Sequence, residues 1–347
     1  MKYSIKPVAA KRELCRSRCL CYNSNMCLIP KTEEKKEASG EGSTEKVPFS
    51  AGAAAMVNSD GCIAVMDSGV GGISVLRELL SVMPGENYLY FGDSVNAPYG
   101  EKPPEVIRAL CRRNVEMLLG RGAKCIVIAC NTATSAAAEL LRNEYPYVPI
   151  IGMEPAVKPA AVSGGHPRVL VLATPLTIKG SRLHQLVAAH ADEADFILRE
   201  APGIVRFVEN GVCDAAPDKV LYAYLRDLLS DFSLKKNSKD TKNDGDTENN
   251  EDAKNDSDTE NDGDTGRKVD AVVLGCTHFP FVRRSIEQVL GYPAAIYDGA
   301  HGTAMQTKRR LEACGLLKKD AASGHGTVEL LNSDKSRISA EQMLLTI

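Results

Sequence analysis

Short apolar runs alternate along the chain with segments in which apolar residues recur every three or four positions. The runs predict buried strands, and the spaced segments predict amphipathic helices. Repeated strand–helix–strand units indicate an α/β protein: two pseudo-symmetric α/β domains with mostly parallel sheets and the active site in the cleft between them. Strands are expected at 62–66, 87–91, 125–129, 149–152, 168–173, 196–199 and 269–274, and helices at 73–82, 103–120, 181–191 and 220–231.

Two segments interrupt this alternation and set the domain boundaries. Residues 1–59 precede the first predicted strand and are expected to be a disordered leader, unless translation starts at Met56. Residues 235–268 contain no Val, Ile, Leu, Phe or Tyr and repeat an Asp/Asn-rich unit, so they are expected to be a solvated, low-complexity acidic insertion. The first domain is then predicted to comprise 60–155 plus about 280–347, and the second 156–279.

Composition and charge exclude several classes of partner. The chain has 347 residues, 44% of them apolar, which is enough for two domains with full cores. No run approaches the roughly 20 apolar residues of a spanning helix, and no signal-peptide pattern is present, so a cytoplasmic protein without membrane contact is expected. The insertion holds 7 of the 42 basic and 11 of the 45 acidic residues, which leaves the remainder at +1. No nucleic-acid partner is therefore expected.

The leader and the insertion both invite comparison with metal sites. In the insertion, the EF-hand frame that starts at Asp258 places Gly263 sixth but puts Val269 where a bidentate Glu is required. The leader cysteines form no pair of CxxC knuckles and have no histidine nearby, so no metal site is predicted there either. These cysteines are Cys15, Cys19, Cys21 and Cys27.

Two other cysteines stand where chemistry is expected in such a fold. Cys130 and Cys276 each end a predicted buried strand, and small hydroxyl or amide residues follow each at once. Ligands of open α/β sheets bind outside the carboxyl ends of the strands, so both thiols are expected at a ligand site. One such cysteine would indicate a nucleophile. Two in matching contexts indicate an acid and a base that face each other across one substrate.

A glycine-rich turn at 68–72 is a third candidate for binding. It lacks the full G-x-G-x-x-G pattern, and Asp67 before it would repel a pyrophosphate, so a dinucleotide site is not expected. Backbone amides at the start of a helix are suited instead to a small anion such as a carboxylate.

Four sequence motifs give the chain a family resemblance. They are 67–72 (DSGVGG), 90–94 (YFGDS) with 97–100 (APYG), 129–133 (ACNTA) and 275–280 (GCTHFP). In order and spacing, from about residue 61 to residue 305, the chain resembles glutamate racemases, within the aspartate/glutamate racemase superfamily. The leader and the acidic insertion lie outside the resemblance.

The resemblance implies an activity and the residues that carry it. It implies racemisation of L- and D-glutamate without pyridoxal phosphate, other cofactors or metal, supplying D-glutamate for bacterial peptidoglycan. Cys130 is implied to act on D-glutamate with help from Asp67, and Cys276 on L-glutamate with help from Glu209 and His278. A homodimer or a monomer–dimer equilibrium is also implied. The implied substrate-binding residues are Asp67, Ser68, Pro98, Tyr99, Gly100, Asn131, Thr132, Thr277 and His278.

Three positions depart from the family pattern, and two other functions stay open. Phe279 stands where a Tyr is usual, Ala201 where a Cys is usual, and His301 where a small residue is usual. An aspartate or hydantoin racemase of the same superfamily fits the thiol pair equally well, because the pair sets the chemistry and not the choice of side chain. A non-catalytic binding or regulatory homologue is less compatible, since binding alone requires neither cysteine.

Overall fold

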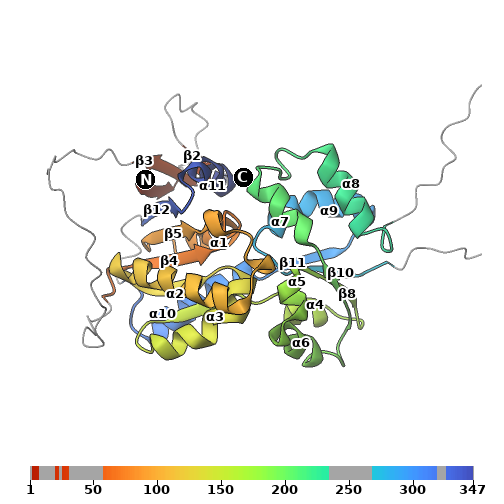
Figure 1. Cartoon of the computed structure of the whole chain (residues 1–347), viewed down its shortest axis with the longest axis horizontal. Helices are drawn as coiled ribbons and strands as arrows, with labels where there is room; N and C mark the ends of the chain where they lie inside the picture. The colour runs from red at the N-terminus through yellow and green to blue at the C-terminus, as the bar shows by residue number, and fades with distance from the viewer. Residues whose placement is uncertain are drawn as a thin grey trace, which may run out of the picture.

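The computed structural model describes residues 58–233, 268–318 and 326–346, together with three strands nearer the N-terminus (Figure 1). Within this part of the chain, no helix is both long and apolar enough to cross a membrane. The described elements form two sheets with helices on their faces, so the predicted α/β class and two-sheet organisation are confirmed.

The first sheet has a parallel centre whose strands alternate side chains between two helical layers. Its strand order is β12-β5-β4-β6-β7, with all four pairs parallel. In β4, Ile63 and Val65 face a core that includes α1, whereas Ala64 and Met66 face a core that includes α2 and α3. The strands are β4 (Cys62–Asp67), β5 (Tyr88–Gly92), β6 (Ala123–Ile128), β7 (Ile150–Gly152) and β12 (Thr327–Asn332). The helices are α1 (Ile73–Val82), α2 (Pro104–Gly120), α3 (Asn131–Glu144), α10 (Ala300–Ala313) and α11 (Ile338–Thr346).

Three strands near the N-terminus extend this sheet beyond β12. Strand β1 (Lys2–Pro7) pairs antiparallel with β12, and β3 (Met26–Pro30) and β2 (Leu20–Tyr22) follow at the edge. This arrangement differs from the disordered leader predicted for 1–59. The remainder of that range up to residue 57, and the insertion at 235–267, lie outside the described residues.

The second sheet is parallel throughout and has the order β11-β10-β8-β9. In Figure 1 its helices form two layers, with α7 to α9 on one side and α4 to α6 on the other. The strands are β8 (Arg168–Ala173), β9 (Asp195–Glu200), β10 (Ala271–Leu274) and β11 (Ala295–Asp298). The helices are α4 (Val157–Ala161), α5 (Pro175–Lys179), α6 (Ser181–Ala188), α7 (Pro202–Glu209), α8 (Lys219–Leu228) and α9 (Arg283–Leu290).

The return of the chain to the first sheet comes later than predicted. Strand β11 lies in the range of about 280–347 that was expected in the first domain, yet it pairs with β10 of the second sheet. Only then does α10 pack against α1. A short apolar run, Ala294 to Tyr297, is the signal for β11 in the sequence. One continuous core joins residues of both sheets, including Val65 and Leu172, so the two halves pack directly on each other.

Candidate active site

Cys130 lies at the junction of β6 and α3, where the chain turns from strand to helix. Its Sγ accepts a hydrogen bond from Ala133 N at 3.4 Å, as the N-cap of α3, and donates one to Ser68 Oγ at 3.7 Å. The residue is only 6% exposed. Burial, and then the charge of Asp67, raise the pKa of Cys130 far above the ordinary thiol value, although the Ala133 amide opposes the shift. Cys130 is therefore a protonated thiol at neutral pH.

Cys276 follows β10 directly and belongs to a chain of three side chains. Its Sγ lies 3.6 Å from Nδ1 of His278, and Nε2 of His278 lies 2.7 Å from Oε1 of Glu209. Burial disfavours a charged ring, but hydrogen bonds to Cys276 and Glu209 outweigh it and raise the pKa of His278 well above its ordinary value. Both nitrogens of an imidazolium are donors, so Cys276 Sγ is the acceptor.

Glu209 is ionised in this arrangement. Burial raises the pKa of Glu209, but the hydrogen bond and the charge of His278, the amide of Val70 and the charge of Arg337 all lower it. The net effect is a pKa below the ordinary value. The Val70 amide donates to Oε1 at 2.8 Å, and Arg337 Nη1 donates to the Glu209 backbone oxygen. The carboxylate is thus held from the glycine-rich turn and from the C-terminal segment.

The two thiols flank one hydrogen bond that crosses between the domains. Thr277 Oγ1, beside Cys276 in the chain, donates to Asp67 Oδ1 at 3.2 Å. Ser68, beside Asp67 in the chain, is the hydroxyl that contacts Cys130. Burial raises the pKa of Asp67, with the positive charge of His278 acting against the shift. The carboxyl ends of β4, β6 and β10 therefore meet at one site, as expected for parallel strands.

The glycine-rich turn has a different role from the one expected. Its amides do bind carboxylates, but these are side chains of the chain itself: Gly69 N donates to Asp67 and Val70 N to Glu209. A Cβ on Gly71 would lie 2.4 Å from Nδ1 of His278, a separation that real Cβ atoms do not show. The glycines therefore let the His278–Glu209 pair approach the backbone.

Asn131 is the clearest candidate for a substrate contact. Both of its polar side-chain atoms are buried without a hydrogen-bond partner among the described residues, and the residue is 3% exposed. Buried amides are rarely left unpaired, so a polar ligand is the natural partner. Asn131 also follows Cys130 directly, which places such a ligand beside the thiol.

The other predicted binding residues behave differently from one another. Thr132 Oγ1 bonds to Thr174 at 3.0 Å, which links α3 to the second domain. Tyr99 does not offer its hydroxyl to a ligand, because it donates to Asp93 Oδ2 at 2.7 Å and is 1% exposed. Pro98 follows a cis peptide bond, and a Cβ on Gly100 would lie 3.0 Å from Thr174. The catalytic and binding roles of all these residues stay predictions.

The three family departures have plain structural settings. Phe279 is fully buried in the core, and His278 contacts Glu209 through Nε2 and the Thr277 hydroxyl through Nδ1, at 2.7 and 3.4 Å. Ala201 is also fully buried, and His301 pairs with Glu78 at 3.1 Å on the surface. The contacts of Arg337, Ser94 and Thr174 were not anticipated from sequence; Ser94 alone belongs to a recognised motif.

Comparison with known proteins decides the family. The sequence model of the Asp/Glu/Hydantoin racemase family matches residues 63–234 of this chain. The glutamate racemase of Clostridium novyi is 38% identical over 274 residues, covering 78% of this chain and 90% of that protein. The chain belongs to the glutamate racemase family. It is an amino-acid racemase, an isomerase, by this relationship. The glutamate racemase of Clostridium perfringens is likewise 38% identical, covering 82% of this chain and 96% of that protein.

Solved glutamate racemases share the fold. The Thermus thermophilus enzyme, solved with β-chloro-D-alanine, has a TM-score of 0.60 at 31% identity and covers 84% of this chain and 94% of its own. The Escherichia coli enzyme, solved with L-glutamate and the activator UDP-MurNAc-Ala, has a TM-score of 0.58 at 29% identity and covers 73% of this chain and 83% of its own.

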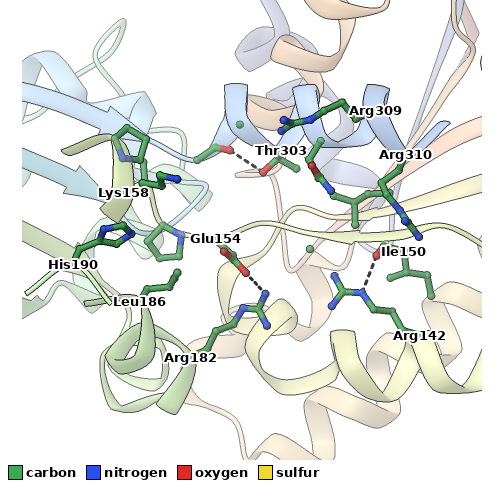
Figure 2. Close-up of a pocket in the computed structure, with 18 of the residues that line it drawn as sticks. Arg142, Ile150, Glu154, Lys158, Arg182, Leu186, His190, Thr303, Arg309 and Arg310 are labelled. Carbon is green, nitrogen blue, oxygen red and sulfur yellow. Dashed lines mark hydrogen bonds and ion pairs between the residues drawn. The ribbon is translucent and has the colours of Figure 1, made fainter. Parts of the chain in front are cut away.

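Away from the thiol site lies a pocket of about 930 Å³. Neither Cys130 nor Cys276 lines it, and its lining is rich in cationic side chains. It lies between the domains, with Arg142 of α3 and Arg310 of α10 on one side and Lys158 of α4 and Arg182 of α6 on the other (Figure 2). Glu154 pairs with Arg182, and it is the one carboxylate in the lining. Partial burial, and then the charge of Arg182, lower the pKa of Arg142. Positive charge is therefore crowded here.

Proposed function

We propose that the chain interconverts L- and D-glutamate with Cys130 and Cys276 as its two acid/base groups, without cofactor or metal. The single observation that carries this proposal is the unequal surroundings of two thiols at one site: burial and the charge of Asp67 raise the pKa of Cys130, whereas Cys276 Sγ lies 3.6 Å from the imidazole of His278, whose own pKa is raised. A racemase requires one base and one acid on opposite faces of the α-carbon.

In the direction from L- to D-glutamate, the Cys276 thiolate takes the α-proton and the Cys130 thiol returns its own proton to the opposite face. The enzyme then holds a Cys276 thiol and a Cys130 thiolate, which is the state needed for the reverse reaction. His278 and Glu209 stabilise the Cys276 thiolate, and Asn131 offers both a donor and an acceptor to the substrate. The product D-glutamate would supply peptidoglycan synthesis in the cytoplasm, with a homodimer or monomer–dimer equilibrium as the working form.

The direct test is a racemisation assay on chelated protein. With no pyridoxal phosphate or metal added, the purified chain is expected to convert L- to D-glutamate at least about 10-fold faster than L- to D-aspartate, because a missing methylene in a fitted site costs 1–3 kcal/mol. Chiral chromatography of both products measures this. Dependence on pyridoxal phosphate or zinc would contradict the two-thiol reaction. Faster turnover of aspartate or of a hydantoin would keep that reaction and replace the substrate.

We also propose that the cationic pocket between the domains binds an anionic effector with a diphosphate group. Arg182 Nε is buried there without a partner among the described residues, and Glu154 offsets one of the surrounding cations. Guanidinium groups bind phosphate oxygens in bidentate fashion. The E. coli racemase was solved with a diphosphate-containing activator, UDP-MurNAc-Ala, which makes this ligand class relevant. Because the pocket contacts both domains, a bound anion would alter their relative packing.

Pyrophosphate is the simplest probe of this pocket. Replacing Arg309 and Arg310 together by Gln is expected to weaken pyrophosphate binding by about 10-fold or more, since each charge-assisted hydrogen bond contributes about 1.5–3 kcal/mol. Isothermal titration calorimetry measures the affinity, and Lys308→Gln on the same helix, outside the pocket lining, is the matched control. If the parent binds neither pyrophosphate nor UDP, or the control weakens binding equally, the effector proposal fails.

A further inference from the structure

The C-terminal helix α11 carries a carboxyl group that the proposed reaction does not use. Glu341 is fully buried, and carboxyl groups are almost never fully buried unless they are paired. Its Oε1 accepts a hydrogen bond from Asn332 Nδ2 at 2.6 Å, while Oε2 has no partner among the described residues. Burial raises the pKa of Glu341 to about 8, with the Asn332 bond opposing the shift. At neutral pH the group is therefore an uncharged acid.

A continuous series of hydrogen bonds leads from this acid to the site. The same Asn332 Nδ2 lies 3.0 Å from Ser94 Oγ, and Ser94 Oγ donates to Glu209 Oε2 at 3.4 Å. The other oxygen of Glu209 bonds to His278, which contacts Cys276. Asn332 thus ties Glu341 to the carboxylate that orients the catalytic imidazole.

The backbone is shaped to admit this series. A Cβ on Gly92, at the end of β5, would lie 2.6 Å from both Asn332 Nδ2 and Glu341 Oε1, so only glycine leaves room for their contact. From the same C-terminal segment, Arg337 of the short helix η4 (Lys335–Arg337) donates to the backbone oxygen of Glu209. Residues 327–346 therefore support Glu209 directly through Arg337 and indirectly through Asn332 and Ser94.

We propose that Glu341, acting through Asn332 and Ser94, is a positioning residue for the series Cys276–His278–Glu209. The proposal rests on the two-thiol function given above. A neutral acid accepts the Asn332 amide without adding charge near the Glu209 carboxylate, whereas an ionised one would repel it. Proton removal by Cys276 is therefore expected to slow as Glu341 ionises. Proton removal by Cys130, which contacts Ser68 and not His278, should change little.

The groups around Glu341 determine how its ionisation is felt. Besides burial, the negative charges of Glu209 and Asp67 raise the pKa of Glu341. The charge of Glu341 in turn adds to the effect of burial in raising the pKa of Tyr90 in β5. Strand β2, which lies beside α11, contains the ionisable residues Cys21 and Tyr22 but no Asp, Glu, Lys, Arg or His. Of the other elements that pack on α11, β12 carries Glu329, which pairs with Arg121, and η4 carries Lys335 and Arg337, the latter paired with Asp334. Helix α1 carries Arg77 and Glu78, and Glu78 pairs with His301.

Two substitutions at Glu341 separate positioning from mere packing. Glu341→Leu fills the same buried position with an apolar side chain of similar size but removes the acceptor, and it is expected to lower kcat about 10-fold or more with little change in KM, as a misplaced catalytic group does. Glu341→Gln keeps the acceptor and is expected to recover most of that loss at pH 7. Unlike the parent, it should keep its activity as the pH rises through about 8. Glu312→Gln, on the surface of α10, is the control.

The decisive readout is the half-reaction of each thiol. With β-chloroglutamate, removal of the α-proton expels chloride, so a single thiol is sufficient. Elimination from the L-form then measures proton removal by Cys276, and elimination from the D-form measures proton removal by Cys130. Glu341→Leu should slow elimination from the L-form and spare the D-form, with thermal unfolding showing that the variant is folded. Equal loss for both enantiomers, or coincident pH profiles for parent and Glu341→Gln, would overturn the positioning role. If Glu341→Leu does not fold, the pH profile of Glu341→Gln still decides. A parent without glutamate racemisation would instead refute the proposed function.

Discussion

Replacing either Cys130 or Cys276 by serine is expected to reduce glutamate racemisation by on the order of 10⁴-fold, the upper range for loss of a general acid or base. A serine hydroxyl is too weak an acid to exist as the required base at neutral pH. Each variant nevertheless keeps one thiol, which still removes a proton from the face that it addresses. The two variants should therefore process β-chloroglutamate with opposite enantiomer preference: Cys276→Ser should act on the D-form and Cys130→Ser on the L-form.

Chiral chromatography of glutamate and chloride release from β-chloroglutamate measure the two reactions separately. Cys111→Ala is the matched control, because Cys111 is a fully buried thiol of α2 outside the site. It is expected to lower stability modestly and to leave the enantiomer preference unchanged. Retention of full racemase activity by either serine variant, or the same preference in both, would return Cys130 and Cys276 to the status of core residues.

The two thiols were predictable from sequence because their positions depend on local rules. A buried parallel strand followed by a helix start places the connecting residue at the carboxyl edge of the sheet, and both Cys130 and Cys276 occupy such a position. Helix 73–82 matched α1 at both ends for a similar reason, since the glycine turn before it and the apolar spacing within it are both local signals.

Only the family resemblance named Glu209 and His278 as partners of Cys276, because their contact depends on tertiary packing that no local pattern encodes. Glu209 lies 69 residues from His278 along the chain, and their 2.7 Å contact requires α7 to pack against the turn after β10. The motif that contains Tyr99 was recognisable, but its hydroxyl turns into the first domain toward Asp93. The Glu341–Asn332–Ser94 series was also hidden, because a glutamate in a short C-terminal helix resembles a surface residue until the helix is docked.

The groups buried around the two thiols differ. Burial and then the charge of Asp67 raise the pKa of Cys130, whereas the imidazolium of His278 lies beside Cys276. A substrate ammonium group placed near Asp67 would offset that negative charge and so ease proton loss from Cys130 when the reaction runs from D- to L-glutamate. In the proposed mechanism, the same carboxylate would favour the thiol form of Cys130 without substrate and assist its proton loss with substrate bound.

Replacing Glu209 by Gln is expected to lower racemisation by about 10²-fold or more, because His278 loses the negative charge that keeps it protonated toward Cys276, although the Gln carbonyl oxygen still offers an acceptor. Elimination from L-β-chloroglutamate should fall with it, while elimination from the D-form should be largely spared. Stability should change as well, since removing one partner of a buried ion pair costs about 3–5 kcal/mol.

The pH dependence of that loss follows from the two pKa shifts. The raised pKa of His278 contributes stability that is fully present below its unfolded value and disappears as pH rises through the raised folded value. The lowered pKa of Glu209 contributes stability that is present above its unfolded value and disappears as pH falls through the lowered folded value. Urea unfolding should therefore show the largest difference in free energy of unfolding between the parent and Glu209→Gln at pH values between the unfolded pKa values of about 4.3 and 6.5. This gap should narrow toward either extreme of pH.

Glu287→Gln, which breaks a surface pair with Arg283, is the control and should change the free energy of unfolding by only about 0.5 kcal/mol at any pH. A gap for Glu209→Gln that is equally small, or that is constant from acid to alkaline pH, would show that the His278–Glu209 pair is not ionised in the folded chain.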